Sequence, residues 1–196
     1  NIYEFEPSRS IVIHNMGADN LFYSRRIGRY PHNSPDLADG EHADIPEATT
    51  ILGAMKLSGK TKKGLSIGVL ESVTANENAV IDDNGVRRRE SVEPMTNYFV
   101  GRVQQDFNKG ETVLGGIVTA VNRDITNPAL NYLPTAAYTG GLNFNRNWKE
   151  RTWYFNANAE FSYIKGKPEA MIAAQRSSAR YYQRPDANYV SVDSSR

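Results

Sequence analysis

The segment YTGGLNFNRNWKERTWYFNANAEFSY, residues 138–163, alternates apolar and polar side chains on both sides of a break at Lys149 and Glu150. Successive side chains of a β-strand point to opposite faces, so this pattern predicts two antiparallel strands joined by a tight turn. One face of the hairpin is aromatic and aliphatic, whereas the other is rich in Asn. Both strands exceed the usual five or six residues of soluble strands and match the roughly 9–11 tilted residues that cross a bilayer.

The same kind of pattern extends back to residue 49. Further strands are predicted at residues 50–60, 65–76, 97–107 and 112–122, although the last has two fairly apolar faces that periodicity does not assign. The links between the six strands are short, long, short, long and short, as in outer-membrane barrels with short periplasmic turns and longer outer loops. The predicted fold class is therefore all-β: an antiparallel up-and-down transmembrane β-barrel segment of about six to eight strands of a larger barrel.

Alternation assigns the strand residues to two faces. The predicted lipid-facing residues are Ile51, Met55, Leu57, Ile67, Val69, Phe99, Val103, Tyr138, Leu142, Phe144, Phe155 and Phe161. Glu71 and Gln105 interrupt this face. The predicted lumen-facing residues are Lys56, Lys60, Arg102, Gln104, Asp106, Asn143, Asn145, Asn156, Asn158 and Glu160. Three aromatic residues beside the short turns, Phe107, Trp148 and Trp153, are expected at one membrane interface.

Two regions follow from this organisation. Residues 1–48 are expected to form lead-in strands, at 10–14 and 21–28, with a long polar loop at 30–46, and residues 49–196 form the hairpins of the wall. Residues 77–94 are expected to be a long charged loop, a short helix is expected within Pro168–Gln183, and residues 189–193 resemble the start of another strand. The links at Thr61, Asn108 and Lys149 should be periplasmic, and the loops around Arg87, Asn127 and Arg176 should face outside.

Composition excludes several functional classes. The 196 residues are 39% hydrophobic, with a mean hydropathy of −0.57, and no run approaches the roughly 18 apolar residues of a membrane-spanning helix. The net charge of +1 gives no reason to expect a nucleic-acid partner, and the absence of cysteine excludes disulfides and thiolate metal sites. The sequence opens at Asn1 without a signal peptide, so we expect a mature or truncated chain from a longer parent.

Few motifs suggest chemistry. Arg87, Arg88 and Arg89 could contact an anion or a partner if their loop is extracellular, but a solvated loop is the simpler interpretation. No cofactor is predicted, and neither nucleophilic nor acid–base catalysis has an identifiable site. The polar loop could hold a metal, although it lacks a known ligand frame and is better explained as solvated; its potential ligands are His32, Asp36, Asp39, Glu41, His42 and Asp44.

Five segments resemble a known family when taken in order: NLFYSRRIG (20–28), LGAMKLSGKT (52–61), GLSIGVL (64–70), VEPMTNYFVGR (92–102) and YYQRPD (181–186). The sequence is similar to an uncharacterised family of Gram-negative outer-membrane β-barrels whose members often carry an N-terminal carbohydrate-binding family 9-like domain. The resemblance implies an outer-membrane location and a longer parent protein with a signal peptide and a sugar-binding domain upstream. It transfers no catalytic residue to this chain.

The expected function is a channel, transport or surface-scaffold role in handling glycans or other nutrients. Outer-membrane lipid, the rest of the parent barrel or other envelope proteins, and glycans are the expected partners. One alternative is a soluble β-sandwich module that binds carbohydrate, because a sandwich also alternates and 11 tyrosines and 2 tryptophans could stack on sugars. A second alternative is an envelope hydrolase whose active site lies outside this segment.

Overall fold

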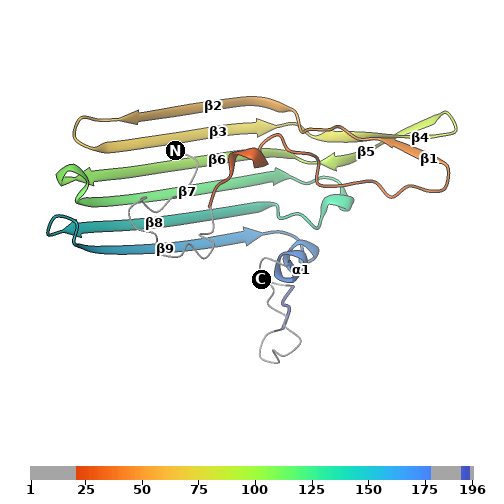
Figure 1. Cartoon of the computed structure of the whole chain (residues 1–196). Helices are drawn as coiled ribbons and strands as arrows, with labels where there is room; N and C mark the ends of the chain where they lie inside the picture. The colour runs from red at the N-terminus through yellow and green to blue at the C-terminus, as the bar shows by residue number, and fades with distance from the viewer. Residues whose placement is uncertain (1–20, 178–190, 195–196) are drawn as a thin grey trace.

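The molecule is built around one six-stranded antiparallel sheet, called the wall below. The computed structural model describes residues 21–177 and 191–194. Neighbouring strands follow the order β2-β3-β6-β7-β8-β9, and their short turns all lie at one end (Figure 1). The strands are β2 (Ile51–Lys60), β3 (Leu65–Thr74), β6 (Met95–Phe107), β7 (Thr112–Asp124), β8 (Ala136–Trp148) and β9 (Trp153–Lys165). The six predicted strands and their antiparallel pairing are confirmed.

A second sheet, called the tongue below, extends from the opposite end of the wall (Figure 1). It has three strands in the order β1-β4-β5, namely β1 (Glu41–Asp44), β4 (Glu77–Asp83) and β5 (Val86–Glu93). The prediction that residues 77–94 form a loop was therefore wrong, and the loop predicted at 30–46 contains a strand. The β4–β5 turn places Asn84 and Gly85 at φ angles of 50° and 91°, a conformation that these two residue types adopt readily.

The remaining elements are short helices. They comprise η1 (Ser24–Arg26), η2 (Asn108–Gly110), η3 (Pro128–Leu130) and α1 (Pro168–Arg176). The predicted helix is confirmed from Pro168, but α1 ends at Arg176, and residues 178–183 lie outside the described residues. Residues 21–28 contain η1 rather than the predicted strand, and residues 191–193 are not a strand. The strand predicted at 10–14 lies outside the described residues.

Within residues 21–177 and 191–194, no helix is both long and apolar enough to cross a bilayer.

The wall is open rather than closed. Within the described part of the chain, β2 and β9 each pair with one neighbour and leave the other edge of the strand free. The antiparallel architecture is thus established, whereas closure into a barrel is not seen. A sheet edge exposes unpaired N–H and C=O groups, which can pair with another strand in water and are intolerable in lipid.

Residues 21–33, called the strap below, run across one face of the wall in front of β6 and β7 (Figure 1). Phe22 is buried against Val100 and Ile117, and Leu21, Ile27 and Leu70 pack around this small core. The strap explains why β7 looked apolar on both faces: Ile117 is covered by the strap, while Val118 on the opposite face is exposed.

Candidate functional site

The register of the wall gathers the predicted residues on two faces. The ten residues predicted to face a lumen all lie on the face crossed by the strap, here called the polar face. All residues predicted to face lipid, except Ile51, lie on the opposite, apolar face together with Phe107, Trp148 and Trp153. The contact of each face with lipid or water stays a prediction.

Ile51 is displaced by an irregularity in β2. It pairs with Thr74, whereas Gly53 pairs with Val73, so Leu52 is an extra residue that shifts the register. Ile51 therefore shares the polar face with Thr74, and a Cβ placed on Gly28 of the strap would lie 3.2 Å from Ile51 Cδ1. This bulge is invisible to a period-two count.

Glu71 and Gln105, the polar residues noted above on the apolar face, have local partners. Asn97 Nδ2 donates a hydrogen bond to Glu71 Oε1. Gln105 Nε2 donates to Lys63 O at 2.8 Å and to Asp106 O at 2.9 Å, beside the β2–β3 turn. Both side chains are thus partly satisfied without another element on that face.

Aromatic side chains fill notches that glycines leave in the apolar face. A Cβ at Gly140 would collide with the ring of Phe161, its cross-strand neighbour, and a Cβ at Gly101 would lie 3.3 Å from the ring of Phe99. A shallow apolar depression of about 510 Å³ remains between them, lined by residues that include Val69, Val103, Val118 and Leu142. The central part of the face around this depression is therefore apolar.

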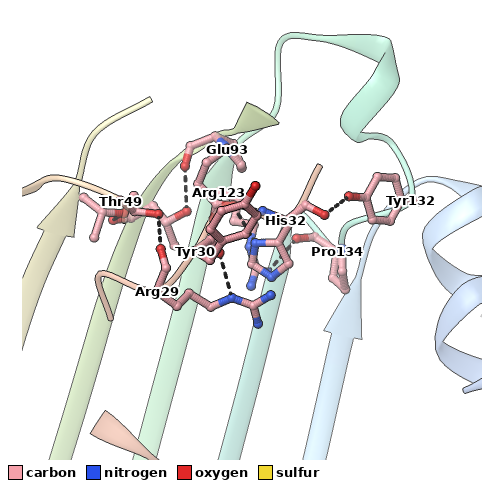
Figure 2. A network of polar contacts seen from close by, with 11 residues as sticks. Arg29, Tyr30, His32, Thr49, Glu93, Arg123, Tyr132 and Pro134 are labelled. Atoms are coloured by element: carbon pink, nitrogen blue, oxygen red, sulfur yellow. Dashed lines mark hydrogen bonds and ion pairs between the residues drawn. The ribbon is translucent and has the colours of Figure 1, made fainter. Parts of the chain in front are cut away.

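The long-link end of the polar face holds a network centred on Glu93, which we call the clamp (Figure 2). Glu93 is only 1% exposed, and its Oε2 accepts the backbone N–H of His32 at 2.8 Å and lies 2.6 Å from His32 Nδ1. The N–H of Asn33 donates to Val92 O at 3.0 Å. A buried carboxylate requires such donors, so Glu93 fixes the strap to the end of β5.

Two further elements hold the strap. Tyr132 Oη donates to His32 O at 3.0 Å, and Thr49 donates to Arg29 O from both its backbone N–H, at 2.9 Å, and its hydroxyl, at 2.8 Å. Burial, together with the nearby charge of Glu93, raises the pKa of the Tyr132 phenol. The clamp thus joins the strap, the tongue and the β7–β8 loop.

Arg123 of β7 lies beside the clamp (Figure 2). Its Nη1 donates to Pro134 O at 3.0 Å, whereas its buried Nε has no hydrogen-bond partner in the described chain. The guanidinium is therefore held by the β7–β8 loop rather than by a carboxylate at hydrogen-bonding distance.

The arginines predicted to contact an anion lie in β5 of the tongue. Arg87 Nε is 3.0 Å from Asp82 Oδ2, and Arg88 bonds Glu41 at 3.0 and 3.1 Å and Glu90 at 3.1 Å. Arg89 is exposed and has no partner among the described residues. Two of the three guanidiniums are thus already occupied by carboxylates.

The hydrogen bonds and ion pairs of the tongue lower the pKa values of two carboxyl groups. A hydrogen bond from the Ala38 N–H, followed by Arg88, lowers the pKa of Glu41. A hydrogen bond from the Gly85 N–H, followed by Arg87, lowers the pKa of Asp82. Asp82 therefore acts in the β4–β5 turn.

The acidic and histidine-containing loop does not converge on a metal site. His32 turns to Glu93, while His42 lies in β1 opposite Asp82. Among the described residues, no group of three or more His, Asp or Glu side chains is arranged to hold a metal ion.

The clamp is the feature that sequence reasoning missed. His32 and Glu93 are 61 residues apart, and Tyr132 is 100 residues from His32. A local signal existed only in part: Glu93 precedes Pro94 at the junction between the charged segment and an alternating strand. Its partner could not be found from spacing.

Comparison with known proteins places the chain in a family. A family model described as "Domain of unknown function (DUF5916)" matches residues 15–189. The searches of curated proteins and of solved structures each found no match. The chain therefore belongs to the DUF5916 family.

Proposed function

We propose that this DUF5916 chain is part of the wall of an outer-membrane β-barrel in a Gram-negative bacterium, with a channel, transport or surface-scaffold role in glycan or nutrient handling. Its partners are then bilayer lipid on the apolar face and further strands at β2 and β9, from the parent barrel or from other envelope proteins. The resemblance of five ordered segments to outer-membrane barrels also supports this proposal.

The exposed apolar face is the observation that supports the proposal most. Large apolar side chains in the middle of the wall are exposed, including Leu142 at 60% and Phe161 at 64%. On a monomeric soluble protein a contiguous apolar surface of this kind is unusual and marks an interface with protein or membrane. The opposite face bears Lys, Arg, Asn and Glu side chains, as expected if the wall separates lipid from water.

Strand length fits the same environment. β6, β7, β8 and β9 each contain 13 residues. At about 3.3 Å per residue and about 45° of tilt, such a strand covers roughly 30 Å, enough for an apolar band of about 25 Å with an aromatic girdle. Phe107, Trp148 and Trp153 share the apolar face at the short-turn end, where a girdle belongs.

A soluble sandwich would need a second sheet over the apolar face. The tongue does not take this position, because only Ala75 and Asn76 separate β3 from β4, and only Pro94 separates β5 from β6. The tongue therefore continues β3 and β6 beyond the wall (Figure 1). No described segment covers the apolar face, which favours lipid over a protein core.

Cysteine labelling tests the proposal cleanly, because the native sequence contains no cysteine. Leu142→Cys on the apolar face, Asn158→Cys on the polar face and Val86→Cys in the tongue are introduced singly into the full-length protein. A membrane-impermeant maleimide is then applied to intact cells and to isolated outer membranes.

We expect Val86→Cys to react in intact cells, Asn158→Cys to react in membranes, and Leu142→Cys to react only after unfolding in denaturant. Reaction of Leu142→Cys in native membranes as fast as Asn158→Cys would overturn the proposal. Recovery of the full-length protein in the soluble fraction, without detergent, would overturn it as well.

A further inference from the structure

Three consecutive rungs of amide and phenol side chains cross β8 and β9 on the polar face. Asn143 pairs with Asn158, Asn145 pairs with Asn156, and Asn147 pairs with Tyr154. Because directly paired residues share a face, these six side chains form one contiguous group, called the amide strip below. Its β8 row spans four residue steps, about 14 Å at roughly 3.4 Å per residue.

The two rows of the strip differ in exposure and in hydrogen bonding. On β8, Asn145 is only 7% exposed and accepts a hydrogen bond from Asn147 Nδ2 at 3.2 Å, and the amide of Asn143 lies over Gly115, where a Cβ would collide with Asn143 Oδ1. On β9, the side chains of Asn156 and Asn158 are exposed and have no hydrogen-bond partner among the described residues. The β8 row is thus packed within the wall, whereas the β9 amides are available to bind a ligand.

Tyr154 closes the strip at its short-turn end. It is 39% exposed, and its ring shares the face with Asn156 and Asn158. The core contacts of the strap are with β6 and β7 and not with the strip, because Phe22 packs on Val100 and Ile117. Among the described residues, the strip is therefore accessible along the polar face.

Charge is nearly absent from this part of the wall. The polar face of β8 has no ionisable side chain, and on β9 its acidic residue is Glu160, two residues from Asn158. Lys56 and Lys60 lie on β2, and Arg102 and Asp106 lie on β6, which β7 separates from β8. A charged solute would thus find no counter-charge on the strip.

The chemistry of the strip selects for hydroxyl groups. A carboxamide offers two N–H donors and a carbonyl acceptor, so it can complement a hydroxyl, which both donates and accepts. An exposed phenol ring adds an apolar platform with a polar edge. We propose that the amide strip binds a neutral, polyhydroxylated oligomer extended along β8 and β9. This inference rests on the proposed function, in which the polar face is exposed to water.

The test is calorimetric titration of the full-length protein, purified in detergent micelles, with maltohexaose as a neutral probe. We expect saturable binding that weakens at least tenfold in the double variant Asn156→Ala/Asn158→Ala and also in Tyr154→Ala. Asn78→Ala is the matched control, because Asn78 is an exposed asparagine of the tongue without a side-chain hydrogen bond to described residues. Hexagalacturonate, an anionic oligomer, should bind at least tenfold more weakly than maltohexaose.

A purely structural amide ladder would give a different result. In that case Asn156→Ala/Asn158→Ala would lower the temperature of unfolding without changing the binding isotherm. We expect instead that the double variant weakens binding and leaves the temperature of unfolding unchanged. Absence of saturable maltohexaose binding, equal affinity in the double variant, or equal affinity for hexagalacturonate would each overturn the inference. If Leu142→Cys is protected from maleimide in membranes, the proposed function still holds when this inference fails. If Leu142→Cys is labelled in membranes, both the proposed function and this inference are overturned.

Discussion

The wall and the tongue are two antiparallel sheets of one chain that place apolar residues in opposite ways. In the tongue, Ala79, Ile81 and Val92 are fully buried, while Arg87 and Asp82 form an ion pair at the surface. In the wall, Leu142 and Phe161 are exposed, while Ile117 on the polar face is covered by the strap. The tongue thus buries its apolar residues and exposes its charged ones, as a sheet in water does. The wall exposes large apolar residues, as expected for a sheet whose apolar side faces lipid.

The largest difference is expected for a charge placed on either face of the wall. Leu142 is the central residue of β8. In the proposed membrane wall, Leu142→Lys would put an ammonium group at the bilayer midplane and lower the free energy of unfolding by about 2–4 kcal/mol. Asn158→Lys places the same charge on the polar face of the neighbouring strand β9 and should change the free energy of unfolding by less than about 0.5 kcal/mol. Guanidinium unfolding in phospholipid vesicles, followed by tryptophan fluorescence, measures both. Equal losses would mean that the two faces meet the same environment.

The clamp, where tongue and wall meet, should give the next largest effect. Glu93→Gln keeps the shape of the side chain but removes the charge that His32 contacts, so we expect a loss of about 1.5–3 kcal/mol. Hydrogen exchange should accelerate at His32 and Asn33, because their N–H groups bond the end of β5. The control is Glu90→Gln, which removes an exposed pair with Arg88 and should cost less than about 1 kcal/mol. Unchanged exchange at His32 in Glu93→Gln would show that the strap is held by other contacts.

A smaller loss is expected in the core of the tongue. Ile81 is fully buried, and Ile81→Val removes one methylene, which typically costs about 0.5–1.5 kcal/mol. Exchange should accelerate in β4 and β5 while β7 and β8 remain unchanged. Val86→Ala is the control, because Val86 is 73% exposed and should contribute within about 0.5 kcal/mol. A uniform change across both sheets would mean that they unfold as one unit.

The same contrast explains what could be predicted from sequence. Side chains such as Leu142 and Asn143 alternate because each face of the wall has one environment, so six strands and their pairing follow from a period of two. The bounds of β6, β7, β8 and β9 extend about two residues beyond the predicted ones, at the long-link ends. There the alternation fades into residues such as Ala136 and Ala137.

The tongue and the clamp could not be predicted in this way. Arg87, Arg88 and Arg89 are consecutive charges without alternation, and they are accommodated in a strand because Asp82 and Glu41 neutralise two of them from other strands. Glu41 is 47 residues from Arg88, so no local pattern contains this pairing. The strap is likewise fixed by contacts distant in sequence, and its presence changes the meaning of the apolar residues in β7.

The smallest expected effect is a dependence of the tongue on pH. The pKa values of Glu41 and Asp82 are lowered from 4.5 and 3.8, the usual values of these groups, so folding favours their charged forms. Their contribution to stability is therefore fully present above about pH 5 and is lost as the pH falls through the lowered pKa values. Both residues are partly exposed, and salt screening keeps the effect small.

Hydrogen exchange of β4 and β5 between pH 6 and pH 3, corrected for the intrinsic pH dependence of exchange, measures this loosening. We expect protection to fall in the tongue and to persist in β7 and β8, where the apolar face has no carboxylate near the centre of the strands. The double variant Glu41→Gln/Asp82→Asn should lack the change, because neither group can then ionise. Persistence of the same pH dependence in that variant would assign it to other groups and remove the ion pairs as the reason that consecutive charges form a strand.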